Sequence, residues 1–208
     1  MLRFFQVNRD IFLRTLCLVT VTLFFTSAGA SQGEIILAVN TLLMQLFTLF
    51  SYVMDGFAYA GEALSGRYIG ARNREALTDT VRHLFGWGVA MAVLFTLVYA
   101  LGGNAFLGLL TDDKEVIAVA DTYFYWALAV PAVGIAAFIW DGIFIGATAT
   151  RGMLLSMAAA AVSFFVLYYG LRPVLANHAL WLAFLAYLLM RGAVQTGLSR
   201  GMIRKAFR

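Results

Sequence analysis

The chain has 208 residues, of which 62% are hydrophobic and 12% are charged, and its formal net charge is +4. A soluble domain has roughly 45–50% apolar and 25% charged residues, so this composition excludes a soluble globule, a disordered chain and a collagen. A single cysteine excludes a disulfide scaffold, and the basic residues lie between long apolar runs rather than on a face that would bind nucleic acid.

Six apolar runs follow one another along the chain. They lie roughly at residues 12–31, 35–65, 84–110, 116–147, 152–171 and 178–198. A helix needs about 20 mostly apolar residues to cross a bilayer core of about 30 Å, and each run is long enough. None alternates in polarity as a strand of a membrane β-barrel would. The sequence therefore predicts an all-α membrane protein with six transmembrane helices in one unit, residues 1–208.

The first run also resembles a secretory signal peptide. Basic residues precede Leu16–Phe25, and Ser27-Ala28-Gly29-Ala30 matches the A-x-A form of a cleavage site. Small residues at the end of a helix are equally common in helix bundles. We expect a retained first helix, whereas cleavage would leave five helices and an outer N-terminus.

The second run carries a polar stripe. It consists of Thr41, Gln45, Thr48, Tyr52, Asp55, Tyr59 and Glu62. The spacing alternates between four and three residues, which keeps these side chains on one face of a helix. Such a stripe is typical of a water-accessible path, and the alternative is a face that hydrogen-bonds neighbouring helices. We predict that its five uncharged members line a substrate path.

Three acids, Asp55, Glu62 and Asp141, cannot be placed in loops without shortening a span. An ionisable group at membrane depth is costly and is therefore a functional candidate. At about 1.5 Å per residue, Asp55 lies ~18 Å before Arg67 and Asp141 lies ~15 Å before Arg151. The two carboxylates are thus expected near mid-membrane at similar depth, with Glu62 closer to the inner surface.

The fourth run contains two further candidates beside its acid. Pro131 removes a helix hydrogen bond ten residues before Asp141 and predicts a hinge. Trp140, next to Asp141, is a candidate contact for an apolar or cationic ligand. A kinked helix with an acid at mid-membrane is typical of a moving part of a membrane protein.

The basic residues predict the orientation of the bundle. With the N-terminus inside, the inner segments hold Arg3, Arg9, Arg14, Arg67, Arg72, Arg74, Arg82, Arg151, Arg191, Arg200, Arg204, Lys205 and Arg208. The outer segments hold Lys114 and Arg172. Thirteen against two is a strong positive-inside bias, so both termini are expected in the cytoplasm.

Motifs for enzymatic chemistry are missing from the sequence. The two histidines, His83 and His178, lie at the ends of predicted spans, and neither is part of an H-E-x-x-H zinc motif. There is also no P-loop and no G-x-S-x-G elbow. We expect no enzyme, no metal site and no cofactor.

Three motifs occur in order along the chain. They are NRDIFLR at residues 8–14, MDGFAYAGEALSGRYIGA at 54–71 and DGIFIGA at 141–147. Together with the six runs, they resemble the multidrug and toxic compound extrusion (MATE) family, and within it the DNA-damage-inducible F branch. In that family twelve helices form two six-helix lobes, and this chain resembles the second, C-terminal lobe, so the first lobe would be absent.

The resemblance implies alternating-access efflux of small cationic or amphipathic compounds in exchange for H⁺ or Na⁺, in the inner membrane of a bacterium. By motif, Asp141 matches the fourth-helix acid of this lobe, which takes part in cation coupling in some relatives. Asp55 and Glu62 belong to the second-helix motif and are further coupling candidates. The expected partners are the lipid bilayer, the substrate, and either the missing N-terminal lobe or a second copy of the chain.

Two other functions remain open at this point. A lipid-linked oligosaccharide flippase of the same superfamily would be expected to offer several arginines to a pyrophosphate, whereas these spans offer acids. A non-transporting membrane scaffold would keep its function when all three intramembrane acids are neutralised.

Overall fold

The computed structural model describes residues 2–207, without the side chains of residues 2–4 and 104. The described residues form six α-helices joined by short turns. The helices are α1 (Leu2–Ala30), α2 (Glu34–Gly70), α3 (Arg74–Leu110), α4 (Lys114–Gly146), α5 (Thr150–Leu175) and α6 (Asn177–Ala206). All six are long and apolar enough to cross a membrane, which confirms the predicted fold class.

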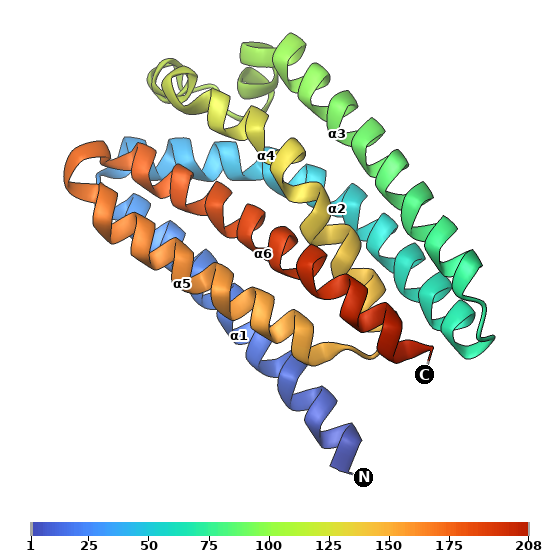
Figure 1. The fold of residues 1–208 in the computed structure, drawn as a ribbon. Helices are drawn as coiled ribbons and strands as arrows, with labels where there is room; N and C mark the ends of the chain where they lie inside the picture. Colours follow the sequence, from blue (N-terminus) through green and yellow to red (C-terminus); the bar gives the residue numbers. More distant parts are fainter. Residues whose placement is uncertain (1, 208) are drawn as a thin grey trace.

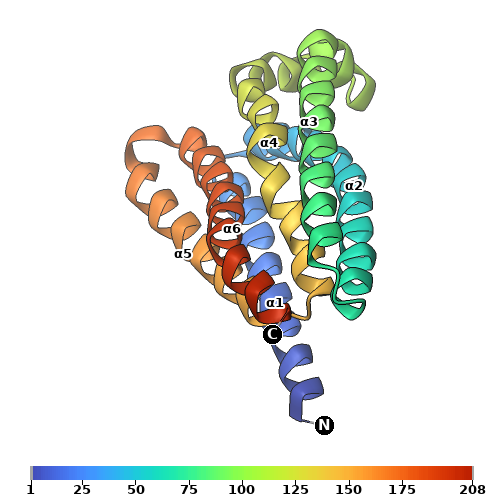
Figure 2. The same cartoon turned by 45° about the vertical axis from the view of Figure 1, so that its right-hand side comes forward.

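Helix α4 lies in the middle of the bundle. It packs against α2, α3 and α6, while α5 lies against α1 and α6 (Figure 2). The two chain ends lie at the same end of the bundle, as six consecutive crossings require (Figure 1). This central position explains why α4 buries residues on all its sides along Val130–Phe144, including the acid at 141.

The helices extend beyond the predicted spans because charged and polar residues continue them. The side chain of Asn73 accepts a hydrogen bond from the Ala76 amide at 3.0 Å and so caps the start of α3. Asp113 does the same for α4 through the amides of Glu115 at 2.9 Å and Val116 at 3.2 Å. Side-chain acceptors of this kind satisfy amides that a helix start leaves unpaired.

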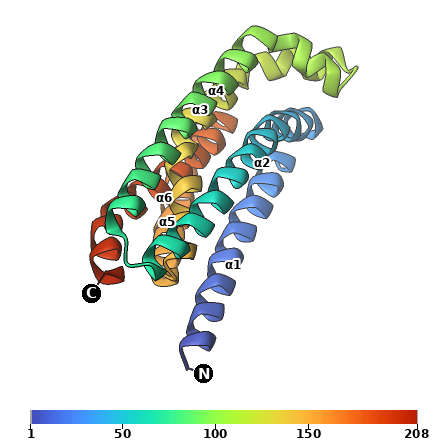
Figure 3. The same ribbon diagram turned by 90° about the vertical axis from the view of Figure 1, so that its right-hand side faces the viewer.

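The regular course of a helix breaks in α3. Gly103 has φ 32° and ψ −121°, a backbone conformation that glycine adopts without a β-carbon clash. Figure 3 shows the end of α3 and the start of α4 turned aside together from the rest of the bundle. Helix α4 itself continues through Pro131, which is buried, so the break found in the structure lies in the preceding helix.

Helices α4 and α2 approach each other closely at two glycines of α4. A β-carbon built at Gly142 would lie 2.0 Å from the carbonyl oxygen of Ala58, and one at Gly146 would lie 2.1 Å from Ser65 Oγ. The two backbones therefore touch, as small residues permit in membrane helix pairs. This contact fixes the register of α4 on α2. It also positions Asp141, the residue before Gly142, beside α2, the helix that carries the polar stripe.

A buried polar cluster joins α2 to α6 at the end of the bundle opposite the termini. The Asn40 and Asn177 amides exchange two hydrogen bonds at 2.8 and 2.9 Å. The Trp181 indole N–H also donates to Asn40 Oδ1 at 2.9 Å. All three side chains are buried within the helix bundle. It serves packing, because interhelical hydrogen bonds hold membrane helices together.

Candidate functional site

Asp141 lies at the centre of a buried charged cluster. Its Oδ2 accepts hydrogen bonds from Arg14 Nη2 and from Arg191 Nη2, the second at 2.8 Å. Its Oδ1 accepts from Gln195 Nε2 at 2.5 Å. Asp141 and Arg191 are 6% and 5% exposed, and Gln195 is fully buried. Two guanidiniums thus share one carboxylate, which leaves the trio with one unbalanced positive charge.

Three helices supply the cluster. Arg191 and Gln195 are one turn apart on α6, where a β-carbon at Gly192 would lie 2.8 Å from that of Ala136 on α4. This close approach lets the short Asp141 side chain reach α6. Arg14 extends from α1 and is 19% exposed at its side chain. The ion pair therefore links α1 to α4, two helices that otherwise make few contacts.

Aromatic side chains enclose the guanidinium of Arg191. Its Cζ lies 5.4 Å from the centroid of the Phe138 ring, a cation–π distance. The Tyr187 hydroxyl interacts with the same guanidinium and also donates to Met157 Sδ at 2.9 Å. Arg191 is thereby fixed between an aromatic face, a phenol and a carboxylate. The guanidinium of Arg191 is therefore a fixed positive charge beside the Asp141 carboxylate.

Asp55 on α2 belongs to the same electrostatic environment. It interacts with Arg191, Asp141 and Arg14, and it is half-buried. No hydrogen bond or ion pair from the described residues reaches its carboxylate. With both carboxylates ionised, the charges of Arg14 and Arg191 are balanced by Asp141 and Asp55. The structure therefore brings two of the three predicted acids into one electrostatic environment with different contacts. Asp141 is hydrogen-bonded within the cluster, whereas Asp55 is half-buried and has no such bond to a described residue.

The cluster retains unused hydrogen-bonding capacity. Among the described residues, Arg14 Nε, Arg191 Nε and Gln195 Oε1 are buried and have no hydrogen-bond partner. Buried polar atoms are nearly always satisfied in proteins, so exceptions concentrated in one place are unusual. Two donors and one acceptor beside a pair of carboxylates can accommodate water or a small ion.

The polar stripe of α2 lies on the face that this bundle leaves uncovered. Tyr52 and Tyr59 are each 70% exposed, and Thr41 and Gln45 are exposed as well. Thr48, Asp55 and Glu62 are half-buried. The opposite face of the helix is buried and apolar, with Leu43, Leu46, Phe50 and Met54 packed in the core. The stripe thus points away from the bundle, with Asp55 at the edge nearest the charged cluster.

Two predicted site residues lie elsewhere. Trp140 is 5% exposed, donates from Nε1 to Thr196 Oγ1 at 2.8 Å and packs against Phe85. It belongs to the core and is not on the stripe, because it projects from the side of α4 that faces α3 and α6. The Glu62 side chain is half-buried, and none of the interactions found among the described residues joins its carboxylate to the Asp141 cluster.

Histidines and acids form no metal centre in the described part of the chain. No group of three or more His, Cys, Asp or Glu side chains is close enough to hold an ion there. His178 instead accepts a hydrogen bond from Trp126 Nε1 at 3.0 Å and contacts the Tyr125 hydroxyl at the same distance. His83 contacts the Asp79 carbonyl at 2.7 Å.

Sequence reasoning missed the partners of Asp141. It assigned Arg14 and Arg191 to the inner surface, because both lie toward the ends of apolar runs. A signal was nevertheless present, since Arg191 and Gln195 are four residues apart and share a helix face inside the sixth run. A basic and an amide side chain together on a membrane helix indicate an internal acidic partner.

Comparison with known proteins agrees with this architecture. The family model described as MatE matches residues 11–174, which include all of α2, α3 and α4 and most of α1 and α5. The chain belongs to the MATE family. Members of this family are transporters of drugs and toxic compounds rather than enzymes, and this MATE chain is a multi-pass membrane protein.

Several curated MATE relatives are similar to the chain. "DNA damage-inducible protein F" of Escherichia coli (strain K12) is 43% identical over 91% of this chain and 41% of its own length. "Protein DETOXIFICATION 45, chloroplastic" of Arabidopsis thaliana is 26% identical over 64% of the chain and 24% of its own length. "Probable multidrug resistance protein NorM" of Photorhabdus laumondii is 28% identical over 44% and 20%. The chain spans about two fifths or less of these relatives.

Proposed function

We propose that the chain forms the C-terminal half of a cation-coupled efflux antiporter that exports small cationic or amphipathic compounds by alternating access. One observation carries the proposal. A polar stripe with an accessible acid lies on the uncovered face of a membrane helix, beside a buried cluster of two arginines and a second acid. Polar and charged side chains are costly against lipid, so this face is expected to line an aqueous cavity.

Asp55 is the proposed exchange site, and Asp141 is the proposed fixed counter-charge. Neutralising Asp141 would leave two guanidiniums without their carboxylate, whereas Asp55 can take up H⁺ or Na⁺ without breaking a hydrogen bond to a described residue. Cation binding at Asp55 leaves an excess positive charge on Arg14 and Arg191. That charge repels a cationic substrate, so ion and substrate exclude one another, which is the requirement for antiport.

A second lobe would face the stripe across the substrate path. Thr41, Gln45, Thr48, Tyr52 and Tyr59 are its proposed lining on this side, with Glu62 near the inner mouth. The partner is an N-terminal six-helix lobe or a second copy of this chain. We place the protein in a bacterial inner membrane with both termini in the cytoplasm, on the strength of the positive-inside bias.

The flippase alternative is less well supported by these contacts. A pyrophosphate needs arginines that are free to bind it, and Arg14 and Arg191 are both engaged by Asp141. The scaffold alternative predicts no substrate movement at all, so transport measurements distinguish it.

The test uses inverted membrane vesicles that contain the transporter with this chain. An imposed pH or Na⁺ gradient should drive uptake of a fluorescent organic cation, and adding the cation should release H⁺ or Na⁺ in return. Vesicles without the transporter provide the baseline. The proposal would be contradicted if neither gradient raised uptake of the organic cation above that baseline and the cation released neither ion. That result would favour the scaffold.

A further inference from the structure

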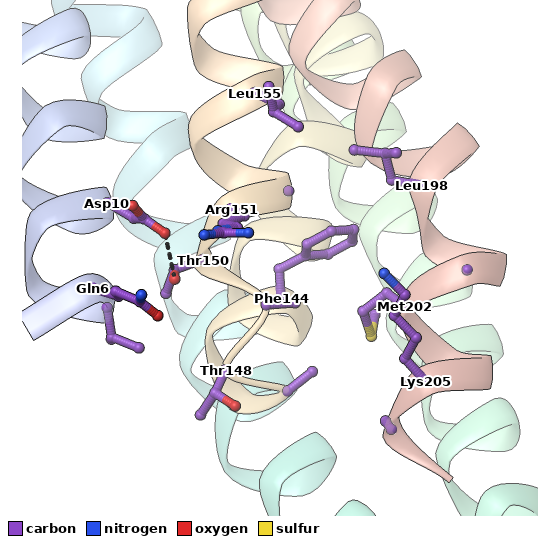
Figure 4. Close-up of a pocket in the computed structure, with 16 residues that line it drawn as sticks. Gln6, Asp10, Phe144, Thr148, Thr150, Arg151, Leu155, Leu198, Met202 and Lys205 are labelled. Carbon is purple, nitrogen blue, oxygen red and sulfur yellow. Dashed lines mark hydrogen bonds between the residues drawn. The ribbon is translucent and has the colours of Figure 1, made fainter. Parts of the chain in front are cut away.

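A separate cavity opens at the end of the bundle that holds both termini. It has a volume of about 570 Å³ and lies between the first turns of α1, the α4–α5 turn, the start of α5 and the end of α6 (Figure 4). None of its lining residues belongs to the polar stripe or to the Asp141 cluster. The cavity is therefore distinct from the proposed transport path.

Two cationic side chains line this cavity from opposite sides. Figure 4 shows Arg151 on α5 facing Lys205 on α6 across the ring of Phe144. Within residues 2–207, neither cation forms an ion pair. The acid in the wall, Asp10, is 2% exposed and already paired with Arg9 at 3.1 Å. The cavity thus has two unbalanced positive charges.

The backbone adds to this positive potential. Helix α5 begins at Thr150, and its N-cap residue Ala149 provides no side-chain cap. The Thr150 hydroxyl donates to Asp10 Oδ2 at 3.2 Å, so it does not cap the helix either. The amides and the positive dipole end of a helix N-terminus stabilise anions. Here they lie on the same wall of the cavity as Arg151, opposite Lys205.

Most of the remaining lining is apolar, although Gln6 and Thr148 also contribute to it. The large apolar side chains are those of Val7, Phe144, Leu155, Leu198 and Met202, and Leu155 is 61% exposed. Positive charge at one end and exposed apolar side chains at the other match an amphipathic anion. The cavity also lies at the end of the bundle that carries most of the basic residues, where a bilayer presents its headgroups.

We propose that this cavity binds the phosphate of an anionic phospholipid between Arg151 and Lys205, with the acyl chains along Leu155 and Leu198. Basic pockets between membrane helices recognise anionic headgroups in this way. The site would tie α1, α5 and α6 together at the inner surface. The proposal does not depend on the transport proposal, because none of its residues takes part in that path.

The test is native mass spectrometry of the purified full chain in an equimolar mixture of phosphatidylglycerol and phosphatidylcholine with identical acyl chains. The chain should retain phosphatidylglycerol preferentially. Arg151→Gln with Lys205→Gln should weaken its retention roughly 30-fold, because each basic residue contributes about 1 kcal/mol near an anionic lipid. The matched control, Arg74→Gln with Arg82→Gln, removes the same charge from exposed positions on α3 outside the cavity and should retain the lipid.

A second pair of variants fills space without changing charge. A β-carbon at Gly201, in the cavity wall, or at Gly197, one turn earlier on α6, would meet no atom within 4 Å. Gly201→Leu should therefore occlude the cavity and release the lipid, whereas Gly197→Leu should not. Equal losses of lipid in the Arg151→Gln/Lys205→Gln variant and in the Arg74→Gln/Arg82→Gln control, or full retention in Gly201→Leu, would overturn the proposal.

Inorganic phosphate at millimolar concentration distinguishes a lipid site from a general anion site. Phosphatidylglycerol should stay bound in its presence, because the acyl chains contribute to binding. Complete displacement by phosphate alone would contradict a lipid site.

Discussion

Arg191 Nη2 lies 2.8 Å from Asp141 Oδ2, and this buried ion pair joins α6 to the central helix α4. Arg14 on α1 binds the same oxygen, so one carboxylate holds two guanidiniums from two different helices. The free energy of a buried ion pair is a balance between a large desolvation cost and a strong attraction. Removing the shared carboxylate therefore disturbs more than one contact.

Asp141→Asn should lower the free energy of unfolding by about 3–5 kcal/mol, because it leaves buried guanidiniums without an ionised partner. Unfolding in detergent, followed by circular dichroism, measures this loss. Asp121→Asn on the same helix is the control, since Asp121 is exposed and has no ion pair with the described residues. Adding Arg191→Gln to Asp141→Asn should recover part of the loss, and equal stability of the two aspartate variants would refute the assigned role.

Gly142→Ala should destabilise the bundle by about 1–3 kcal/mol, because its β-carbon would overlap the Ala58 carbonyl and push α4 from α2. Gly86→Ala on α3 is the matched change, since a β-carbon there meets no atom within 4 Å. Thermal unfolding of the two variants compares them directly. A Gly142→Ala protein as stable as Gly86→Ala would show that the helices do not touch at this position.

Asp113→Ala should cost about 1 kcal/mol of stability, because the amides of Glu115 and Val116 lose their side-chain acceptor at the start of α4. Asp112→Ala removes the same charge one residue earlier without removing a cap, and it should be nearly neutral. Urea or detergent titration of both variants measures the difference. Equal losses would assign the effect to charge rather than to capping.

Cysteine labelling tests whether water reaches the polar stripe. In a Cys17→Ser background, Tyr52→Cys and Tyr59→Cys should react with a membrane-impermeant maleimide, because both positions are expected to line an aqueous path. Val166→Cys on α5 is 66% exposed, close to the 70% of the two tyrosines, but it lies on an apolar face and should stay unlabelled in the bilayer. Protection of both stripe positions would mean that lipid or protein covers them.

The apolar runs predicted the six helices because membrane crossing depends on local composition, which is visible in the sequence. The stripe of α2 was predictable for the same reason, since its face is set by helical periodicity. The spacing of Asp55 from Arg67 and of Asp141 from Arg151 also predicted similar depths for the two acids, and in the structure they interact electrostatically.

The partners of Asp141 depend on tertiary contacts instead. Whether Arg14 and Arg191 reach water or turn inward depends on the tilt of α1 and on the close approach at Gly192, and neither is a local property. The core position of Trp140 was not predicted for the same reason, because it depends on the packing of α4 against α6. The break at Gly103 was missed because a single glycine within an apolar run is compatible with a regular membrane helix.

Substrate-driven proton or sodium release from vesicles carrying Asp55→Asn tests the central claim most directly. The account predicts that this variant binds the organic cation less well and releases neither ion, while Asp121→Asn releases as much as the unmodified transporter. Undiminished ion release by Asp55→Asn would contradict the assignment of Asp55 as the exchange site.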